Sequence, residues 1–189
     1  IQISDKNVQK ILQNLGVTVE TQRVRELIDS FADRKEGGMI GMEEEFKEIF
    51  SILKIKKYSQ EDLQEIIRVH WEPFIQYAHA RRGVKELLEY LKTHGYKLGV
   101  IANIWSGGMN PALERLKLQQ YFDTTIASVD VGFQKPDHKI FHLALENLEL
   151  TPEQTIMVGD NPRTDIQGAH ALGIITVRLL RGLHRNNPD

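Results

Sequence analysis

Two patterns of hydrophobic and polar residues divide this chain near residue 80. Before that point the apolar residues recur every three or four positions, which is the spacing of helices that bury one face. Four segments show this spacing, at residues 5–16, 19–34, 41–55 and 59–74. In the first segment the apolar face carries Val8, Ile11, Leu12 and Leu15. Four amphipathic helices with short connections predict a small helical bundle.

Residues at the ends of these segments are typical of helix termini. Asp5 is a candidate N-cap of the first helix, and Gly16 is a candidate stop signal. Ser59, followed three residues later by Asp62, is a variant of the capping box, in which two side chains bind main-chain amides of the first turn. We therefore expect helices to begin near residues 5 and 59.

From about residue 81 the pattern alternates between short apolar runs and helical segments. The expected strands are 97–103, 124–132, 155–160 and 174–180, and the expected helices are 83–95, 110–122, 137–150 and 162–173. Asp137 is the expected N-cap of the third of these helices. Unbroken apolar strands that alternate with helices are typical of a parallel sheet covered on both faces. This part of the chain therefore predicts an α/β fold.

Composition narrows the class of protein further. Of the 189 residues, 41% are hydrophobic and 26% are charged, which suffices for a packed core. The formal net charge of -2 gives no indication of nucleic-acid binding. The chain has no cysteine, which excludes disulfides and thiolate chemistry and suits the cytoplasm. No apolar run approaches the roughly 20 residues that a membrane-spanning helix needs, so we expect no membrane partner.

The loops that follow the first three expected strands carry residues of complementary chemistry. Asn103 follows the first strand and Lys135 the second, while Asp160 and Asp165 follow the third. In open α/β sheets, ligands bind beyond the carboxyl ends of the strands, so these side chains are expected to meet at one edge. Two carboxylates suit a hard cation such as Mg²⁺, and a lysine offers a charge to a phosphate or a carboxylate. The pattern predicts a site for a metal and a phosphate.

Each of these residues also has a purely structural interpretation. Asp160 and Asp165 are suitable caps for the helix that follows them. Lys135 taken alone is a typical surface lysine, and Asn103 is a typical turn residue. Their occurrence at three neighbouring strand ends favours a common site over four separate structural roles.

Three longer segments resemble a known family. They read RGVKELLEYLKTHGYKLGVIAN, VGFQKPDHKIF and VGDNPRTDIQGAHALGI. Together they resemble the haloacid dehalogenase-like hydrolase superfamily, in particular its phosphatase and dehalogenase branch with a helical cap. The resemblance covers nearly the whole chain. It implies a helical cap domain at residues 1–78 and a Rossmann-like, three-layer core with a parallel sheet at residues 79–189.

The resemblance also implies roles for the acidic pair and the lysine. Asp160 would be a Mg²⁺ ligand, and Asp165 would assist it directly or through water. Lys135 would hold the nucleophile and the phosphoryl group that is transferred. These three are therefore the expected catalytic residues, with Mg²⁺ as the cofactor and a small phosphorylated molecule as the substrate.

One departure from the family pattern concerns phosphoryl binding. In the family pattern, the strand that corresponds to residues 97–103 ends in a Ser or Thr hydroxyl followed by Asn, whereas this chain has Ala102 and Asn103. Loss of one hydrogen bond to the phosphoryl group costs roughly 10²-fold or more in rate unless a neighbour replaces it. Ser106 is the candidate replacement. We expect Ala102, Asn103 and Ser106 to line the substrate site together with Lys135.

A second departure concerns the nucleophile. In the family it lies in a D-x-D motif after the first core strand, ahead of the cap, whereas this chain opens with IQISDKN. Asp5 with Asn7 is a poor match, because no Gly-Thr turn follows. The chain also has no initiator methionine. We expect the first core strand and its aspartate to lie upstream, and residues 1–189 alone to be inactive.

These observations favour a Mg²⁺-dependent phosphatase of a small phosphorylated metabolite that reacts through an aspartyl-phosphate. Two alternatives stay open. Ala102 and the missing nucleophile also fit a non-catalytic binding or regulatory protein. A haloacid dehalogenase on the same scaffold is less consistent with the acidic pair, because that reaction needs no cation. The sequence indicates neither the substrate nor the oligomeric state.

Overall fold

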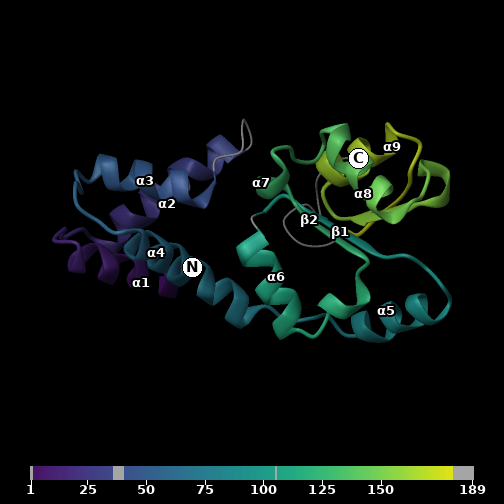
Figure 1. The fold of residues 1–189 in the computed structure, drawn as a ribbon, viewed down its shortest axis with the longest axis horizontal. Coiled ribbons are helices and arrows are strands. Elements are labelled where there is room, and N and C mark those ends of the chain that lie inside the picture. Colours follow the sequence, from purple (N-terminus) through teal and green to yellow (C-terminus); the bar gives the residue numbers. More distant parts are fainter. Residues whose placement is uncertain (1, 36–40, 105, 181–189) are drawn as a thin grey trace. The chain divides into compact units, whose positions relative to one another are not determined.

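The structure is a computed structural model that describes residues 2–35, 41–104 and 106–180, without the side chains of residues 2, 3, 32–35 and 106 (Figure 1). The chain forms two compact units. A helical unit comprises Ile1–His79 with Gly107–Leu116, and an α/β unit comprises Ala80–Ser106 with Lys117–Asp189. The expected domains, 1–78 and 79–189, stay a prediction, and these units differ from them in grouping Gly107–Leu116 with the helices.

The helical unit contains the four helices that the hydrophobic spacing predicted. They are α1 (Gln2–Asn14), α2 (Thr21–Lys35), α3 (Met42–Ile52) and α4 (Gln60–Tyr77), and α6 (Ser106–Arg115) joins them from Gly107 onward. α4 packs against both α1 and α3. The core of this unit is fully buried at Leu12, Phe46, Phe50, Leu63 and Ile66. Within the described ranges, every helix is too short or too polar to cross a bilayer.

The structure confirms one of the two predicted helix starts in this unit. Ser59 caps α4 by accepting from the amide of Asp62, whose carboxylate accepts in return from the Ser59 amide. The prediction for Asp5 is wrong, since α1 begins at Gln2 and Asp5 lies inside it. Asp5 is 3% exposed and accepts a hydrogen bond of 2.9 Å from Nε of Arg25. A partner 20 residues away on another helix decided its role, and local spacing does not show such a partner.

The α/β unit is built on four short parallel strands. They are β1 (Gly99–Ala102), β2 (Thr124–Ala127), β3 (Ile156–Gly159) and β4 (Ile175–Arg178). β1 pairs with β2 and β3 pairs with β4, both in parallel. Among the described residues no pairing joins β1 to β3, so the expected sheet consists of two halves. The parallel strands and intervening helices confirm the α/β class.

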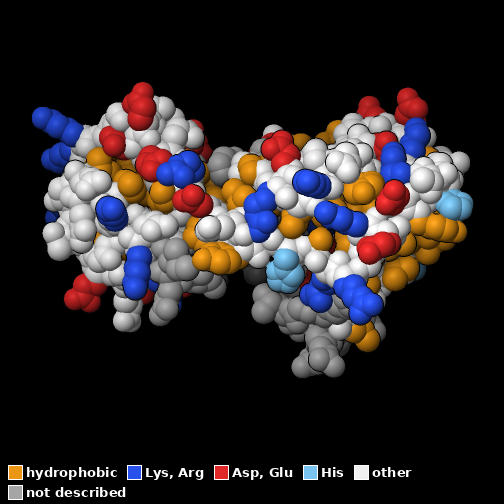
Figure 2. Space-filling view, turned by 90° about the horizontal axis from the view of Figure 1, so that it is seen from below, with side chains coloured by type: hydrophobic (Ala, Val, Ile, Leu, Met, Phe, Trp, Pro, Cys, Tyr) orange, Lys and Arg blue, Asp and Glu red, His pale blue; other side chains and the backbone are white. Residues whose placement is uncertain are grey.

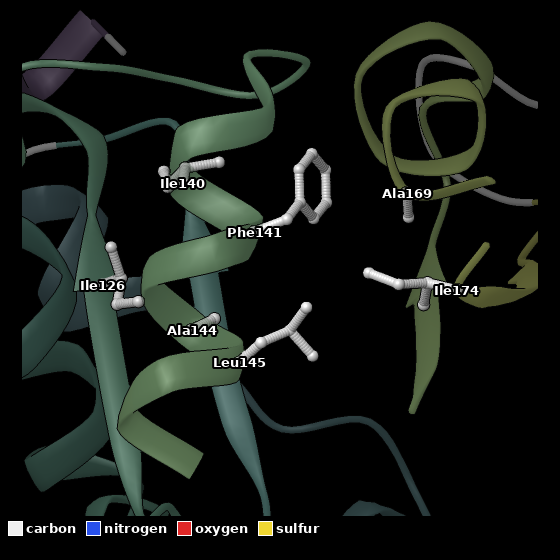
Figure 3. Packing of buried hydrophobic residues seen from close by; sticks show 7 residues of the cluster. All are labelled: Ile126, Ile140, Phe141, Ala144, Leu145, Ala169 and Ile174. Carbon is white, nitrogen blue, oxygen red and sulfur yellow. The ribbon is translucent and has the colours of Figure 1, made fainter. Parts of the chain in front are cut away.

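One helix packs against residues of both halves of the sheet. α8 (His138–Leu148) begins after Asp137, the predicted N-cap, whose side chain accepts from the amide of Lys139 at 2.9 Å. Residues of α8 pack with side chains from β2, from α9 (Gly168–His170) and from Ile174, which directly precedes β4 (Figure 3). The cluster consists of Ile126, Ile140, Phe141, Ala144, Leu145, Ala169 and Ile174. The two pairs of strands therefore share one hydrophobic core.

The other face of β3 and β4 is exposed. Successive side chains of a strand point to opposite faces, and Met157 packs against the core cluster. The residues that alternate with this face are 45–59% exposed, and they are Ile156, Val158, Ile175 and Val177. α5 (Val84–Thr93) likewise buries none of its side chains. Figure 2 shows hydrophobic side chains lying among Lys and Arg on the surface of this unit.

Three predicted elements of this unit differ in the structure. The end of the expected strand 124–132 is a helical turn, α7 (Ser128–Val131), where the Val129 amide binds the Ile104 carbonyl. The expected helix 110–122 ends at Arg115 and is followed by a 3₁₀ turn, η1 (Gln119–Tyr121). The expected helix 162–173 begins as a π-helical turn, η3 (Pro162–Gln167), before α9. Each change lies at a loop where tertiary contacts redirect the chain. The short 3₁₀ turn η2 (Pro152–Gln154) precedes β3.

Candidate functional site

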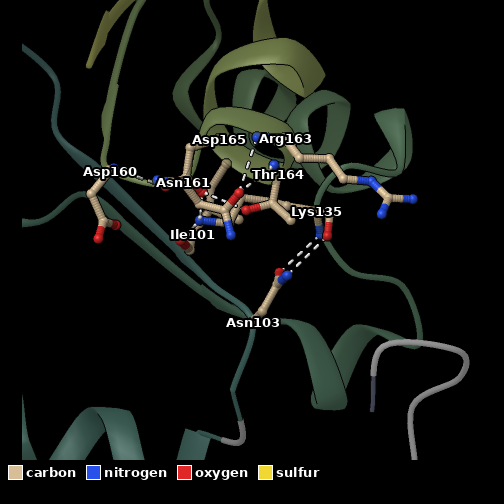
Figure 4. A network of polar contacts seen from close by, with 8 residues as sticks. All are labelled: Ile101, Asn103, Lys135, Asp160, Asn161, Arg163, Thr164 and Asp165. Carbon is tan, nitrogen blue, oxygen red and sulfur yellow. Dashed lines mark hydrogen bonds and ion pairs between the residues drawn. The ribbon is translucent and has the colours of Figure 1, made fainter. Parts of the chain in front are cut away.

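Four of the predicted site residues meet at one edge of the α/β unit (Figure 4). Asn103 directly follows β1, Lys135 lies between α7 and α8, and Asp160 and Asp165 follow β3. Hydrogen bonds and an ion pair connect these three loops. The loops thus gather where ligands of open α/β sheets bind.

Lys135 and Asp165 form a buried ion pair at this edge. The Lys135 Nζ lies 2.7 Å from Oδ1 of Asp165, and the two side chains are 9% and 8% exposed. Nζ also donates to the Ile101 carbonyl of β1 at 2.9 Å. Lys135 is therefore buried and is not a typical surface lysine. Its ammonium group is fixed at the strand ends by two oxygen atoms.

Asp165 connects the lysine to the loop after β3. Its Oδ2 accepts from the amides of Asp160 and Asn161, each at 3.1 Å. Its Oδ1 accepts from the Thr164 hydroxyl at 3.2 Å in addition to binding Lys135. These hydrogen bonds offset the cost of burying the polar atoms of this side chain. It organises the loop and the lysine together.

Gly159 is what allows Asp165 to fold back on the strand. A Cβ atom at position 159 would lie 2.4 Å from Oδ2 of Asp165 and 2.5 Å from its Cβ. Real side chains do not approach so closely, so only glycine fits here. A glycine at the end of an apolar strand is the sequence signal for such a close approach.

Asn161 is the cap of the turn after β3. Its side-chain oxygen accepts from the amides of Arg163 and Thr164, each at 3.0 Å. The interpretation of Asp160 and Asp165 as N-caps of this segment is therefore wrong, because Asn161 is the N-cap. Asn161 supplies the side chain that binds the free amides of the first turn.

Asp160 differs from its neighbour because its carboxylate takes no part in the network. In the described part of the chain, only its main-chain amide is hydrogen-bonded, and the carboxylate points away from the other residues in Figure 4. The side chain is half-buried. Mg²⁺ typically uses one or two carboxylates and completes its shell with waters and phosphate oxygens. The free carboxylate of Asp160 fits that requirement.

The metal-binding capacity of this edge depends on groups beyond the acidic pair. Over residues 2–35, 41–104 and 106–180, no three His, Asp or Glu side chains converge in a way that would hold a metal. Asp160 offers its oxygens freely, whereas Asp165 is engaged by Lys135. A cation at this edge would therefore need waters, a phosphate, or a further carboxylate to complete its coordination.

The phosphate-binding candidates near β1 take different positions. Ala102 is the last residue of β1 and pairs with Ala127, and its methyl group offers no hydrogen-bond donor. Asn103 binds the main chain of Lys135 through both polar atoms of its side chain. Ser106 is the first residue of α6, and its side chain lies outside the described part. Of the two described side chains, that of Asn103 joins the network.

A second close contact was not foreseen from the sequence. A Cβ at Gly168 would lie 3.0 Å from Cβ of Pro136 and 3.0 Å from Cε2 of Phe141. The start of α9 thus rests directly on the residue after Lys135. The small pair Gly168 and Ala169 in the sequence is the signal for this packing, since small residues let a helix backbone approach its neighbour.

Comparisons with known proteins agree with this arrangement. Residues 6–179 match the model of the family described as haloacid dehalogenase-like hydrolase. A glyceraldehyde 3-phosphate phosphatase of Methanocaldococcus jannaschii is 39% identical over 106 residues, which are 56% of this chain and 46% of the relative. The pyrimidine 5'-nucleotidase YjjG of Escherichia coli is 37% identical over 109 residues, which are 57% of this chain and 47% of that protein.

A solved structure shares the fold over almost the full chain. The crystal structure of a HAD phosphatase from Thermococcus onnurineus matches with a TM-score of 0.65 and 24% identity, over 99% of this chain and 79% of that one. The matched segments of the two curated relatives span about half of their length, 46% and 47%. The family match, by contrast, extends from the first helix of the helical unit to the end of β4. The chain therefore belongs to the haloacid dehalogenase-like hydrolase family.

Proposed function

We propose that this chain carries the cap and most of the core of a Mg²⁺-dependent phosphatase, which acts on a small phosphorylated metabolite through an aspartyl-phosphate. The observation that carries the proposal is the ammonium group of Lys135, held at the strand ends 2.7 Å from Asp165, in whose loop the carboxylate of Asp160 stays free among the described residues. Relatives that are named phosphatases support it.

Each residue of the network has a role in this proposal. Lys135 stabilises the negative charge on the phosphoryl oxygens, and Asp165 keeps its ammonium group oriented. Asp160 would hold Mg²⁺, with Asp165 supporting the loop, and the cation would supply positive charge against the negative charge that develops on the phosphoryl group. The helical unit serves as a cap that excludes water and selects the substrate.

The attacking carboxylate is proposed to come from a strand seated between β1 and β3. Among the described strands, each of these two has a neighbour on one side only. Unpaired strand edges are costly unless they are covered. An aspartate at the carboxyl end of such a strand would face Lys135.

The proposed reaction has two steps. An oxygen of the attacking carboxylate forms a bond to phosphorus while the bond from phosphorus to the ester oxygen breaks, and the leaving oxygen takes up a proton. Water then hydrolyses the acyl phosphate, which releases inorganic phosphate and restores the carboxylate. Lys135 opposes the charge on phosphorus-bound oxygens in both steps.

The test is a phosphatase assay on the full-length protein that contains this chain, with p-nitrophenyl phosphate in the presence and absence of Mg²⁺. Activity should require Mg²⁺ and be lost in Lys135→Ala. Lys139→Ala is the matched control, because Lys139 is an exposed lysine four residues further on. Absence of turnover in the wild type would favour a binding or regulatory protein. Metal-independent hydrolysis of a 2-haloacid would favour a dehalogenase.

Residues 1–189 alone are proposed to be inactive. In the described part of the chain, the carboxylate that contacts Lys135 is that of Asp165, and four polar groups already bind it. The same assay on this segment and on the full-length protein compares the two directly. Equal activity would show that the nucleophile lies within the 189 residues.

A further inference from the structure

The side chain of Asn103 is fully directed at the main chain of Lys135. Its Nδ2 donates to the Lys135 carbonyl at 2.8 Å, and its Oδ1 accepts from the Lys135 amide at 2.9 Å. The two bonds reproduce the pairing that a neighbouring strand residue would make (Figure 4). A primary amide has the donor and the acceptor that this pairing needs, side by side on a short side chain.

The same stretch of β1 also fixes the other end of Lys135. The Ile101 carbonyl, two residues before Asn103, accepts from the Lys135 Nζ at 2.9 Å. Lys135 is therefore held at its backbone by Asn103 and at its ammonium group by Ile101. Because the side chain between these points is long and flexible, fixing both ends removes most of its rotational freedom.

We infer that Asn103 is a positioning residue for Lys135, and not a ligand of the substrate. Its two hydrogen bonds set the backbone from which the lysine reaches the ion pair with Asp165. This inference rests on the proposed function, since it gives Asn103 a purpose in the reaction that Lys135 serves. It also accounts for an asparagine directly after β1 in a chain whose preceding residue, Ala102, carries no hydroxyl.

Asn103→Ala removes both bonds, and Asn103→Asp keeps the acceptor but replaces the donor by an oxygen that faces the Lys135 carbonyl. Both variants should lower kcat of the full-length protein roughly 10- to 100-fold with little change in KM, because supporting residues act on geometry more than on binding. Asn147→Ala is the matched control, because Asn147 also donates a side-chain hydrogen bond, to Thr124 at the amino end of β2, whereas the site lies at the carboxyl ends of the strands. It should leave kcat unchanged.

A double-mutant cycle separates positioning from direct contact. If Asn103 acts through Lys135, then Asn103→Ala should have no further effect on the residual activity of Lys135→Ala. If Asn103 binds the phosphoryl group itself, the two losses should multiply. Multiplying losses, or a rise in KM as the main effect of Asn103→Ala, would overturn the inference.

A second measurement does not depend on activity. The Lys135 amide proton should exchange slowly with solvent in the full-length protein, because it is bonded to Oδ1 of Asn103. It should exchange faster in Asn103→Ala but stay protected in Asn103→Asp, which keeps the acceptor. Equal protection of this amide in the wild type and in Asn103→Ala would refute the proposed contact between the Asn103 side chain and the Lys135 main chain. If that contact is found but the full-length protein turns over no phosphate ester, the proposed function fails while the contact itself stands.

Discussion

Two ion pairs with a buried carboxylate, one in each unit, differ in their surroundings. Asp5 and Arg25 join α1 to α2, with side chains that are 5% and 38% exposed. Lys135 and Asp165 join two loops at the strand ends and are 9% and 8% exposed. The helical pair connects two packed elements. The loop pair binds the main-chain amides of Asp160 and Asn161, and the same loop carries the free carboxylate of Asp160.

The difference shows that a buried charge pair is not by itself evidence of a site. Ion pairs inside a protein stabilise poorly relative to apolar packing and are retained for several reasons. Asp5 and Arg25 fit a structural role between helices. At the strand ends, the loop that holds Asp165 also carries Asp160, whose carboxylate has no hydrogen bond among the described residues. A free metal-type ligand in the same loop as an oriented lysine is the feature that indicates a chemical use for this pair.

The largest expected effect comes from breaking each pair in turn. Lys135→Ala should lower kcat of the full-length protein by roughly 10²- to 10³-fold or more, because it removes a charge that stabilises the transition state. Arg25→Ala should leave kcat per folded molecule unchanged. Steady-state kinetics, corrected for the folded fraction, give the comparison. A similar loss in both variants would mean that neither pair is specific to the reaction.

The same two variants should also differ in stability. Removing one member of a buried pair leaves the other charge uncompensated and typically costs about 3–5 kcal/mol. Arg25→Ala should fall below that range, because the side chain of Arg25 is 38% exposed and water replaces part of its contact. Lys135→Ala should fall at its lower end, because Asp165 keeps two amide donors. Urea denaturation of residues 1–189 measures both.

Gly159→Ala sharpens the comparison from the backbone side. Its new Cβ would lie 2.4 Å from Oδ2 of Asp165, so the side chain must move. Overpacking of this kind costs about 1–3 kcal/mol, and here the displacement should also lower activity. Gly173→Ala is the control, since φ at Gly173 is +81° and no atom lies within 4 Å of the new Cβ. That control should lose stability alone. Full activity in Gly159→Ala would argue against the role of Asp165.

Mg²⁺ should raise the melting temperature of residues 1–189, and the rise should grow with the Mg²⁺ concentration. This effect should be smaller than those of the substitutions above. A ligand that binds the folded state contributes about 2.7 kcal/mol at 100 times its Kd, and weak binding reduces this. Asp160→Asn should abolish the shift without lowering the starting melting temperature, because that carboxylate has no hydrogen bond to lose among the described residues. An undiminished shift in the double variant Asp160→Asn, Asp165→Asn would refute the metal assignment.

The smallest effect concerns an exposed pair in the α/β unit. The Lys92 ammonium, followed by the Leu98 amide, holds the pKa of Asp123 below its usual value. The stabilisation from a lowered carboxylate pKa is present above the unfolded pKa of about 3.9 and is lost as pH falls through the folded value. Asp123→Asn should thus destabilise the protein near neutral pH and flatten its acid unfolding. The pair is one-third exposed, so the effect should be no more than about 1 kcal/mol. Identical acid unfolding curves would contradict it.

Much of the local structure could be predicted because it depends on neighbours in the chain. The capping box of Ser59 and the N-cap at Asp137 use partners two or three residues away, and both are found. Asp5 was assigned wrongly because its partner, Arg25, lies on another helix. The apolar residues after Ala127 also suit a strand, whereas the chain forms a helical turn there in which the Val129 amide donates a hydrogen bond to the Ile104 carbonyl.

The candidate site divides along the same line. The residue types at the strand ends, and their order after β1, α7 and β3, could be read from the chain. The sequence could not show which of Asp160 and Asp165 pairs with Lys135, since both follow the same strand and both carry carboxylates. Lys135 binds one of them because Gly159 leaves room for Asp165 to fold back. That space exists only once the loop has formed.

The sequence by itself determined most of the helical and strand segments, the α/β class and the residue types in the strand-end loops, because these follow from spacing and from side-chain type. The tertiary structure alone decided which polar atoms are already engaged. Asn103 turns from a possible anion donor into a partner of the Lys135 backbone, and Asp160 keeps the carboxylate that the network leaves free. The reason is physical: hydrogen bonds and ion pairs are satisfied by distance in space, and residues 32 or more positions apart meet only in the fold.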